Sequence, residues 1–97
     1  MNFLKVSEFA LQNYKQFVKG NMKLSISEVE KKLTRNVLLS TKVGEFDNHI
    51  VYAYGQLRIF VKNNSVVTCV MNHQESLEGW ELDYQKKEML DRVLNIA

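Results

Sequence analysis

Cationic and aromatic side chains are interleaved within residues 49–62, the part of the chain best suited to chemistry. Arg58 and Lys62 can neutralise phosphate, and Phe60 between them can stack on an unpaired base. His49 and His73 carry imidazoles that can transfer a proton near neutral pH. The combination predicts a nucleic-acid-binding face on which Arg58 stabilises phosphodiester charge and either histidine moves a proton.

A plainer interpretation of the same residues stays open. Aromatic residues in strands are usually core, and an outward Arg or Lys usually only keeps a sheet soluble. The two histidines stand far apart with no grouping of carboxylates or thiolates, so we expect no metal and no cofactor. Cys69 lies within an apolar run and is expected to be a packed side chain.

Two further charged segments carry partner hypotheses. Lys15 and Lys19 recur at four-residue spacing near the end of the first predicted helix, where they could contact phosphate or form a solvated face. Residues 74–97 carry six Asp/Glu against three Lys/Arg. A negative, aromatic-bearing surface for another protein is therefore predicted there, at Trp80, Glu81, Asp83 and Tyr84.

Helices are predicted before and after the strands in the sequence. Apolar residues recur at helical spacing in residues 3–18, and Ser25 with Glu28 forms a capping box that opens a second helix to about residue 35. A third helix is expected over residues 77–96 with Ser76 as its cap. Its inward positions would be Leu82, Met89, Val93 and Ile96, and Asp83 would pair with Lys87.

Between the helices, the period becomes that of extended chain. Strands are predicted at residues 37–43, 49–54, 57–62 and 65–71, with turns at 44–48, Gly55-Gln56 and Asn63-Asn64. Simple counting places one set of residues on the core face: Ile50, Tyr52, Tyr54, Leu57, Ile59, Val61, Val66, Thr68 and Val70. The other face would hold His49, Val51, Ala53, Arg58, Phe60, Lys62, Ser65, Val67, Cys69 and Met71, and could include His73. The expected fold is α+β: two N-terminal helices, a four-stranded antiparallel meander and a C-terminal helix.

Composition sets the class of protein. The chain has 97 residues, of which 45% are hydrophobic and 25% charged, so we expect one globular domain over residues 1–97. It contains no long apolar run of membrane-span length and no basic-then-apolar N-terminus, which predicts a cytoplasmic protein without a membrane partner.

The segments LSISEVEKKL (24–33) and YAYGQLRIFVKNNSVVTCV (52–70), in this helix and strand order, resemble the RelE, colicin D and barnase-like group of small bacterial endoribonucleases. The resemblance covers roughly residues 9–72 and implies metal-independent RNA cleavage. Arg58 and Lys62 would stabilise phosphate charge, Thr68 would be the polar residue of the last strand, and Lys15 the basic residue of an early helix. The early helix has no histidine, and Thr68 is expected on the core face, away from Arg58.

The leading hypothesis is therefore an RNA-binding, toxin-like endoribonuclease domain. The first alternative is a protein-binding module, such as a small inhibitor encoded by a phage or mobile element, that uses its acidic C-terminal helix against a bacterial protein. The second is a structural subunit that forms a homodimer through an uncovered half of the sheet.

Overall fold

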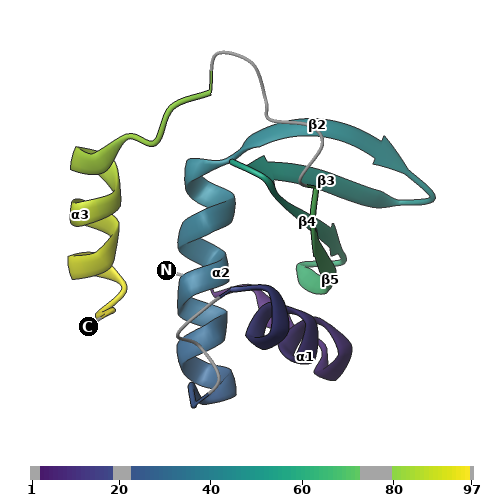
Figure 1. Ribbon diagram of the computed structural model, residues 1–97, viewed down its shortest axis with the longest axis horizontal. Helices are drawn as coiled ribbons and strands as arrows, with labels where there is room; N and C mark the ends of the chain where they lie inside the picture. Colours follow the sequence, from purple (N-terminus) through teal and green to yellow (C-terminus); the bar gives the residue numbers. More distant parts are fainter. Residues whose placement is uncertain (1–2, 19–22, 73–79, 97) are drawn as a thin grey trace.

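The computed structural model describes residues 3–18, 23–72 and 80–96. The elements follow the order β1 (Lys5–Val6), α1 (Glu8–Phe17), α2 (Ile26–Leu39), β2 (Thr41–Phe46), β3 (His49–Tyr54), β4 (Leu57–Lys62), β5 (Ser65–Met71) and α3 (Tyr84–Val93) (Figure 1). The fold class is α+β, as predicted. No helix of the described part is long and apolar enough to cross a membrane.

The sheet has five strands in the order β1-β5-β4-β3-β2. Strands β2 to β5 form the predicted antiparallel meander, but β1 adds a parallel edge strand, so the prediction of four antiparallel strands is incomplete. Lys5 N donates to Asn64 O at 3.1 Å and Ser7 N donates to Val66 O at 3.0 Å. A two-residue strand is too short for alternation to reveal, and its partner lies far along the chain.

The hairpin turns use residues that tolerate a left-handed backbone. Asn63 and Asn64 have φ values of 50° and 62°, and Gly55 has φ 58°, as expected of two-residue turns. Asp47 and Asn48 repeat the same geometry, with φ values of 47° and 63°. The predicted turn at 44–48 was therefore too long, because β2 continues to Phe46.

A bulge in β5 changes which residues share a face. Val61 pairs with Val66 but Phe60 pairs with Thr68, so Val67 is an extra residue. Beyond it, Cys69 joins the core and Thr68 pairs with Phe60, so the pairing reverses the predicted assignment for residues 68–71. Cys69 is fully buried, which confirms its expected packing, although on the opposite face from that predicted.

Helices α1 and α2 cover one face of the sheet. One cluster joins Ala10, Leu11, Tyr14, Val29 and Leu33 from the helices to Leu57, Ile59, Val61, Val66 and Cys69 from the strands. Ser7 caps α1, its hydroxyl accepting from Ala10 N at 3.0 Å, so α1 begins at Glu8 and not at residue 3. Ser25 caps α2 as predicted, accepting from Glu28 N at 3.2 Å. The predicted strand at residues 37–43 was wrong in its first half, because α2 continues to Leu39.

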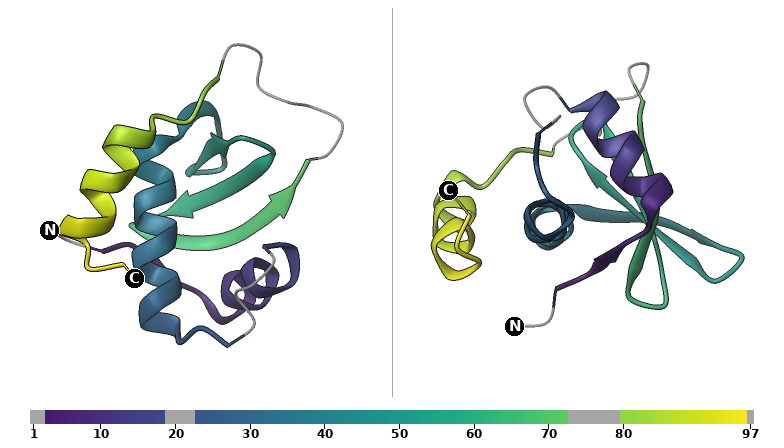
Figure 2. Two further views of the ribbon diagram at one scale, coloured as in Figure 1. Left: turned by 60° about the vertical axis from the view of Figure 1, so that its left-hand side comes forward. Right: turned by 90° about the horizontal axis from the view of Figure 1, so that it is seen from below.

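Helix α3 lies beside α2 and not on the sheet, as both views in Figure 2 show. It begins at Tyr84, and Asp83 is its N-cap, accepting from Lys86 N at 3.0 Å. The buried side chains are Leu90 and Leu94, whereas Met89 and Val93, predicted to point inward, are exposed. Lys87 contacts Asp91 at 3.3 Å, not the predicted Asp83. The predicted cap Ser76 lies outside the described residues.

Candidate functional site

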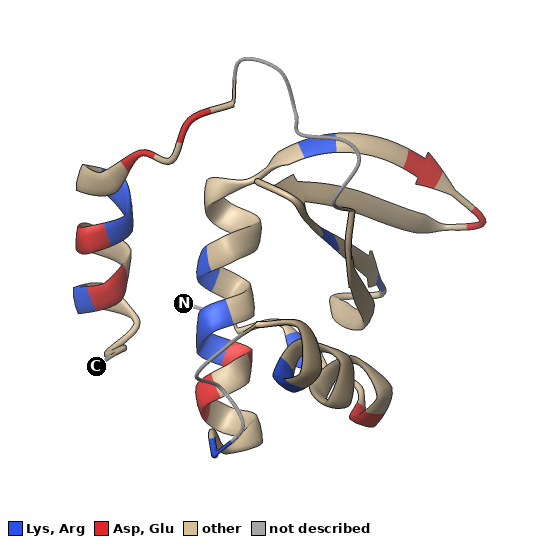
Figure 3. Cartoon of the chain, viewed as in Figure 1, with Lys and Arg blue, Asp and Glu red and all other residues tan. Residues whose placement is uncertain are grey.

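The face of the sheet that points away from α1 and α2 is called the open face here. By strand pairing it comprises Thr41, Phe46, His49, Val51, Ala53, Arg58, Phe60, Lys62, Ser65 and Val70. Strands β3, β4 and β5 carry no Asp or Glu, and Figure 3 shows cations alone along β4. A negatively charged ligand would therefore meet cations on the central strands without an opposing carboxylate.

Three rings gather at one end of the open face, and we call them the ring cluster: Phe46, His49 and Phe60. The Phe46 and His49 rings stack with centroids 5.4 Å apart, and Phe46 meets Phe60 edge to face at 5.9 Å. Phe46 is 55% exposed, and His49 and Phe60 are half-buried. His49 Nδ1 lies 2.9 Å from Asp47 O, which orients the imidazole against Phe46. The cluster therefore presents a preformed aromatic surface to solvent.

Lys62 lies next to this cluster. It follows Phe60 by two residues on β4, so both side chains project from the same face. Arg58 precedes Phe60 by two residues and lies on that face as well. The predicted alternation of Arg58, Phe60 and Lys62 along one strand is therefore present in the structure.

Arg58 lies two residues from Phe60 but at the opposite end of the open face from His49. It pairs with Ala53, which is fully buried, and its Nη1 donates to Gly55 O at 2.7 Å. His49 is four residues from Ala53 along β3, a separation of about 13 Å at the rise of a strand. The structure does not bring His49 and Arg58 to one phosphate, and His73 lies outside the described residues.

Of the two lysines predicted near the end of the first helix, the described one, Lys15, is not part of the open face. Lys15 is a half-buried residue in the last turn of α1, in the helical layer that covers the other side of the sheet. Lys19 lies outside the described residues. Of the four predicted nucleic-acid-binding residues, Phe60 and Lys62 are thus adjacent and Lys15 stands apart from them.

The residues predicted to bind a protein have divided roles. Trp80 is half-buried and meets Tyr54 edge to face with centroids 5.4 Å apart. Asp83 is engaged as the α3 cap, whereas Glu81 is exposed and Tyr84 is 75% exposed. The predicted acidic helix is not acidic: within its bounds α3 carries three Lys/Arg and two Asp/Glu. In the described part, acidic residues lie both on the segment before α3 and on α3 itself, as Figure 3 shows.

Sequence reasoning missed Phe46, which completes the ring cluster. The Asp47-Asn48 pair is the same kind of signal as Asn63-Asn64, and using it would have extended β2 to Phe46 and placed its ring opposite His49. Thr68 pairs with Phe60, but its Oγ1 accepts from Asn13 Nδ2 of α1 at 2.8 Å, so its side chain is not counted in the open face. Its hydroxyl is therefore engaged with α1.

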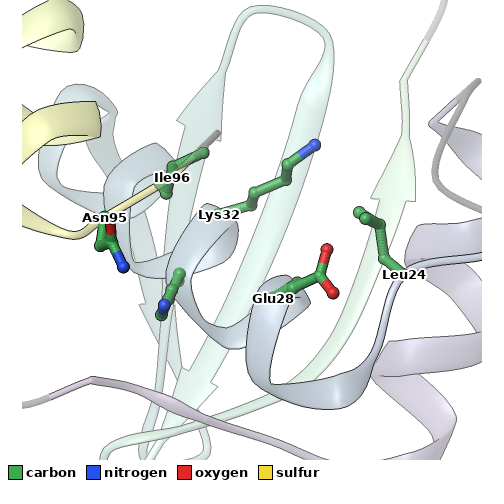
Figure 4. Close-up of a pocket in the computed structure, with 6 residues that line it drawn as sticks. Leu24, Glu28, Lys32, Asn95 and Ile96 are labelled. Carbon is green, nitrogen blue, oxygen red and sulfur yellow. The ribbon is translucent and has the colours of Figure 1, made fainter.

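A cavity of about 380 Å³ lies between α2 and the residues after α3. Figure 4 shows Glu28 and Lys32 reaching into it from α2, with Leu24 on one side and Asn95 and Ile96 on the other. The lining carries one glutamate, Glu28, against two lysines of the same helix, Lys31 and Lys32, so one positive charge remains. No group of three His, Cys, Asp or Glu side chains in the described ranges could hold a metal ion.

Comparison with known proteins places the chain in a family. No curated protein matches the sequence, and no solved structure matches the fold. The sequence model of the YorE family matches residues 4–93, which takes in every described element from β1 to α3. The chain therefore belongs to the YorE family.

Proposed function

We propose that this protein binds single-stranded RNA through the open face, with the ring cluster as its centre. The supporting observation is the exposed stack of Phe46 and His49 beside Phe60, with Lys62 next along β4. Exposed rings stack on unpaired bases, and an adjacent lysine neutralises the phosphate that follows. A duplex would not offer unstacked bases, so the proposal is for single strands.

The Phe60 ring gives the sharpest test. Replacing one ring that stacks on a base costs about 1–3 kcal/mol, so Phe60→Ala should weaken binding of a short single-stranded RNA by roughly 5-fold to 150-fold. Phe9→Ala is the matched control, because Phe9 is an exposed phenylalanine on α1 in the helical layer. Fluorescence anisotropy measures both variants. Equal affinity of Phe60→Ala and the parent protein would exclude the ring cluster as the site.

Two lysine variants distinguish RNA binding at the open face from RNA binding at the helices. Lys62→Ala should lower the slope of log affinity against log salt by about 0.7, the contribution of one phosphate contact on a single strand. Lys15→Ala should leave the slope unchanged, because Lys15 lies in the helical layer. A larger effect at Lys15 than at Lys62 would move the site to α1.

Binding and cleavage are separable in the same samples. We propose binding as the activity that the geometry supports, because His49 and Arg58 lie at opposite ends of the open face. Incubation with RNA in EDTA, followed by a denaturing gel, should leave the RNA intact. Discrete cleavage that Arg58→Ala abolishes would instead establish a metal-independent ribonuclease with Arg58 on the phosphate.

A second candidate function uses α3 as a docking helix for a bacterial protein, as an inhibitor encoded by a phage or mobile element would. The observation in its favour is the exposure of Tyr84, Met89 and Val93 on α3. Tyr84→Ala combined with Glu81→Lys tests it without removing the Asp83 cap. If capture of a purified partner survives the double variant, this surface is not the docking site.

A further inference from the structure

A second cavity, of about 430 Å³, lies at the other end of the sheet from the ring cluster. It forms where the C-terminal ends of α1 and α2 meet the β3–β4 turn and the end of β5. Phe17, Leu57 and Met71 give it apolar walls, and Arg35 and Gln56 add polar groups. Small-molecule sites in proteins have this size, roughly 300–1,000 Å³, and this mixture of apolar walls with a few polar groups.

Arg35 is the one charged residue in the lining, and its guanidinium is held from two sides. Its Nε and Nη2 donate to Asn36 Oδ1 at 3.2 and 3.1 Å, and its Nη1 donates to Asp91 Oδ1 at 2.9 Å. A guanidinium has five N–H groups, so two remain after these three contacts within the described structure. The two remaining N–H groups lie one on each Nη of a guanidinium that is held in place, and charged N–H donors of this kind suit a carboxylate.

The net charge around Arg35 favours a ligand with one negative charge. Asp91 also lies 3.3 Å from Lys87 Nζ, so two cations surround one carboxylate. Burial alone would raise the pKa of Asp91, but the hydrogen bonds and charges of Arg35 and Lys87 outweigh it and lower this pKa. Asp91 is therefore ionised at neutral pH, and the three groups carry a net charge of +1. One carboxylate neutralises that charge, whereas a phosphate dianion would exceed it.

We propose that this groove binds a small organic carboxylate with an apolar, ring-sized body. The carboxylate binds the two remaining N–H groups of Arg35, and the body packs against Phe17, Leu57 and Met71. The lining strand residues belong to the face that α1 and α2 cover, so the groove is independent of the open face and of the proposed RNA binding.

The protein carries its own reporter for this site. Tyr54 lines the groove, and its ring meets that of Trp80, the one tryptophan of the chain, at 5.4 Å. Titration with 3-phenylpropionate should change the Trp80 fluorescence and shift the amide NMR signals of groove residues, with a Kd of roughly 1–5 mM for a ligand of this size. The uncharged 3-phenylpropionamide should bind at least ~10-fold more weakly, because it cannot form the charge-assisted pair.

Two substitutions and one ligand complete the test. Phe17→Ala should weaken 3-phenylpropionate binding at least ~3-fold through loss of apolar contact, while Phe9→Ala, on the same helix but outside the groove, should leave it unchanged. Phenyl phosphate should bind more weakly than the carboxylate at mildly alkaline pH. The proposal is overturned if the acid causes no shifts, if the amide or the phosphate binds as tightly, or if Phe17→Ala binds like the parent protein.

Discussion

The attachment of α3 to α2 gives a prediction whose magnitude follows from the structure. Leu90 and Leu94 are 4% and 1% exposed, and neither belongs to the main core cluster. Leu→Ala removes three carbons, a loss of about 2.4 kcal/mol at ~0.8 kcal/mol for each buried methylene. Cavity formation raises the cost to about 2–5 kcal/mol in rigid cores. Because α3 packs along one side and can close the gap, we expect about 2.5 kcal/mol for each single variant.

The double variant tests whether α3 can detach from α2 while the rest of the protein stays folded, that is, whether α3 is a docked arm or an integral helix. If α3 leaves α2, the cost cannot exceed the free energy of docking, so Leu90→Ala with Leu94→Ala should cost clearly less than the ~5 kcal/mol sum. Hydrogen exchange should then show lost protection in α3 and retained protection in β4.

Met89→Ala is the control on the same helix, because Met89 is 48% exposed and should change the free energy of unfolding by less than about 0.5 kcal/mol. Full additivity, with β4 losing protection together with α3, would refute the docked-arm reasoning. An effect of Met89→Ala equal to that of Leu90→Ala would refute the assignment of the buried face.

Three further predictions concern single groups. Gly55→Ala should destabilise the protein by about 1 kcal/mol in urea unfolding, because Gly55 has φ 58°. Gly44→Ala, with nothing within 4 Å of its new Cβ, should change the free energy of unfolding by less than half as much, and equal effects of the two variants would contradict this reasoning. The lowered pKa of Asp91 means that its stabilising contribution is complete above the ordinary value of 3.8 and is lost as pH falls below it. The difference in free energy of unfolding between the parent protein and Asp91→Asn should therefore be constant near neutral pH and shrink in acid. A difference that grows in acid would contradict the lowered pKa of Asp91. Burial raises the pKa of the Cys69 thiol to about 11. A thiol reagent at mildly alkaline pH should therefore modify Cys69 only after the protein unfolds. Rapid labelling of the native protein would contradict the buried position of Cys69.

The parts of the fold that could be predicted are those that local chemistry determines. Alternation and two-residue Asn or Gly turns located β3, β4 and β5 at their observed bounds, and the Ser25 capping box located the start of α2. The grouping of Phe60 with Lys62 follows from the same alternation, because it depends on one strand alone.

The features that were missed depend on contacts distant in sequence or on a single inserted residue. Strand β1 exists because Lys5 and Val6 pair with Ser65 and Val66, which no local pattern announces. The extra residue Val67 interrupts the alternation of β5 and exchanges the faces beyond it. The contact between α3 and α2 determines which face of α3 is buried. The spacing of the apolar residues alone fitted more than one face, so the wrong face was predicted to be buried.

The most direct test of RNA binding by the open face is an amide NMR titration with a short single-stranded RNA. We predict that the largest shifts occur at Phe46, His49, Phe60 and Lys62, and that α3 signals stay in place. Absence of shifts at saturating RNA, or shifts concentrated on α1 or on Tyr84 of α3, would contradict the assignment of the open face as the RNA site.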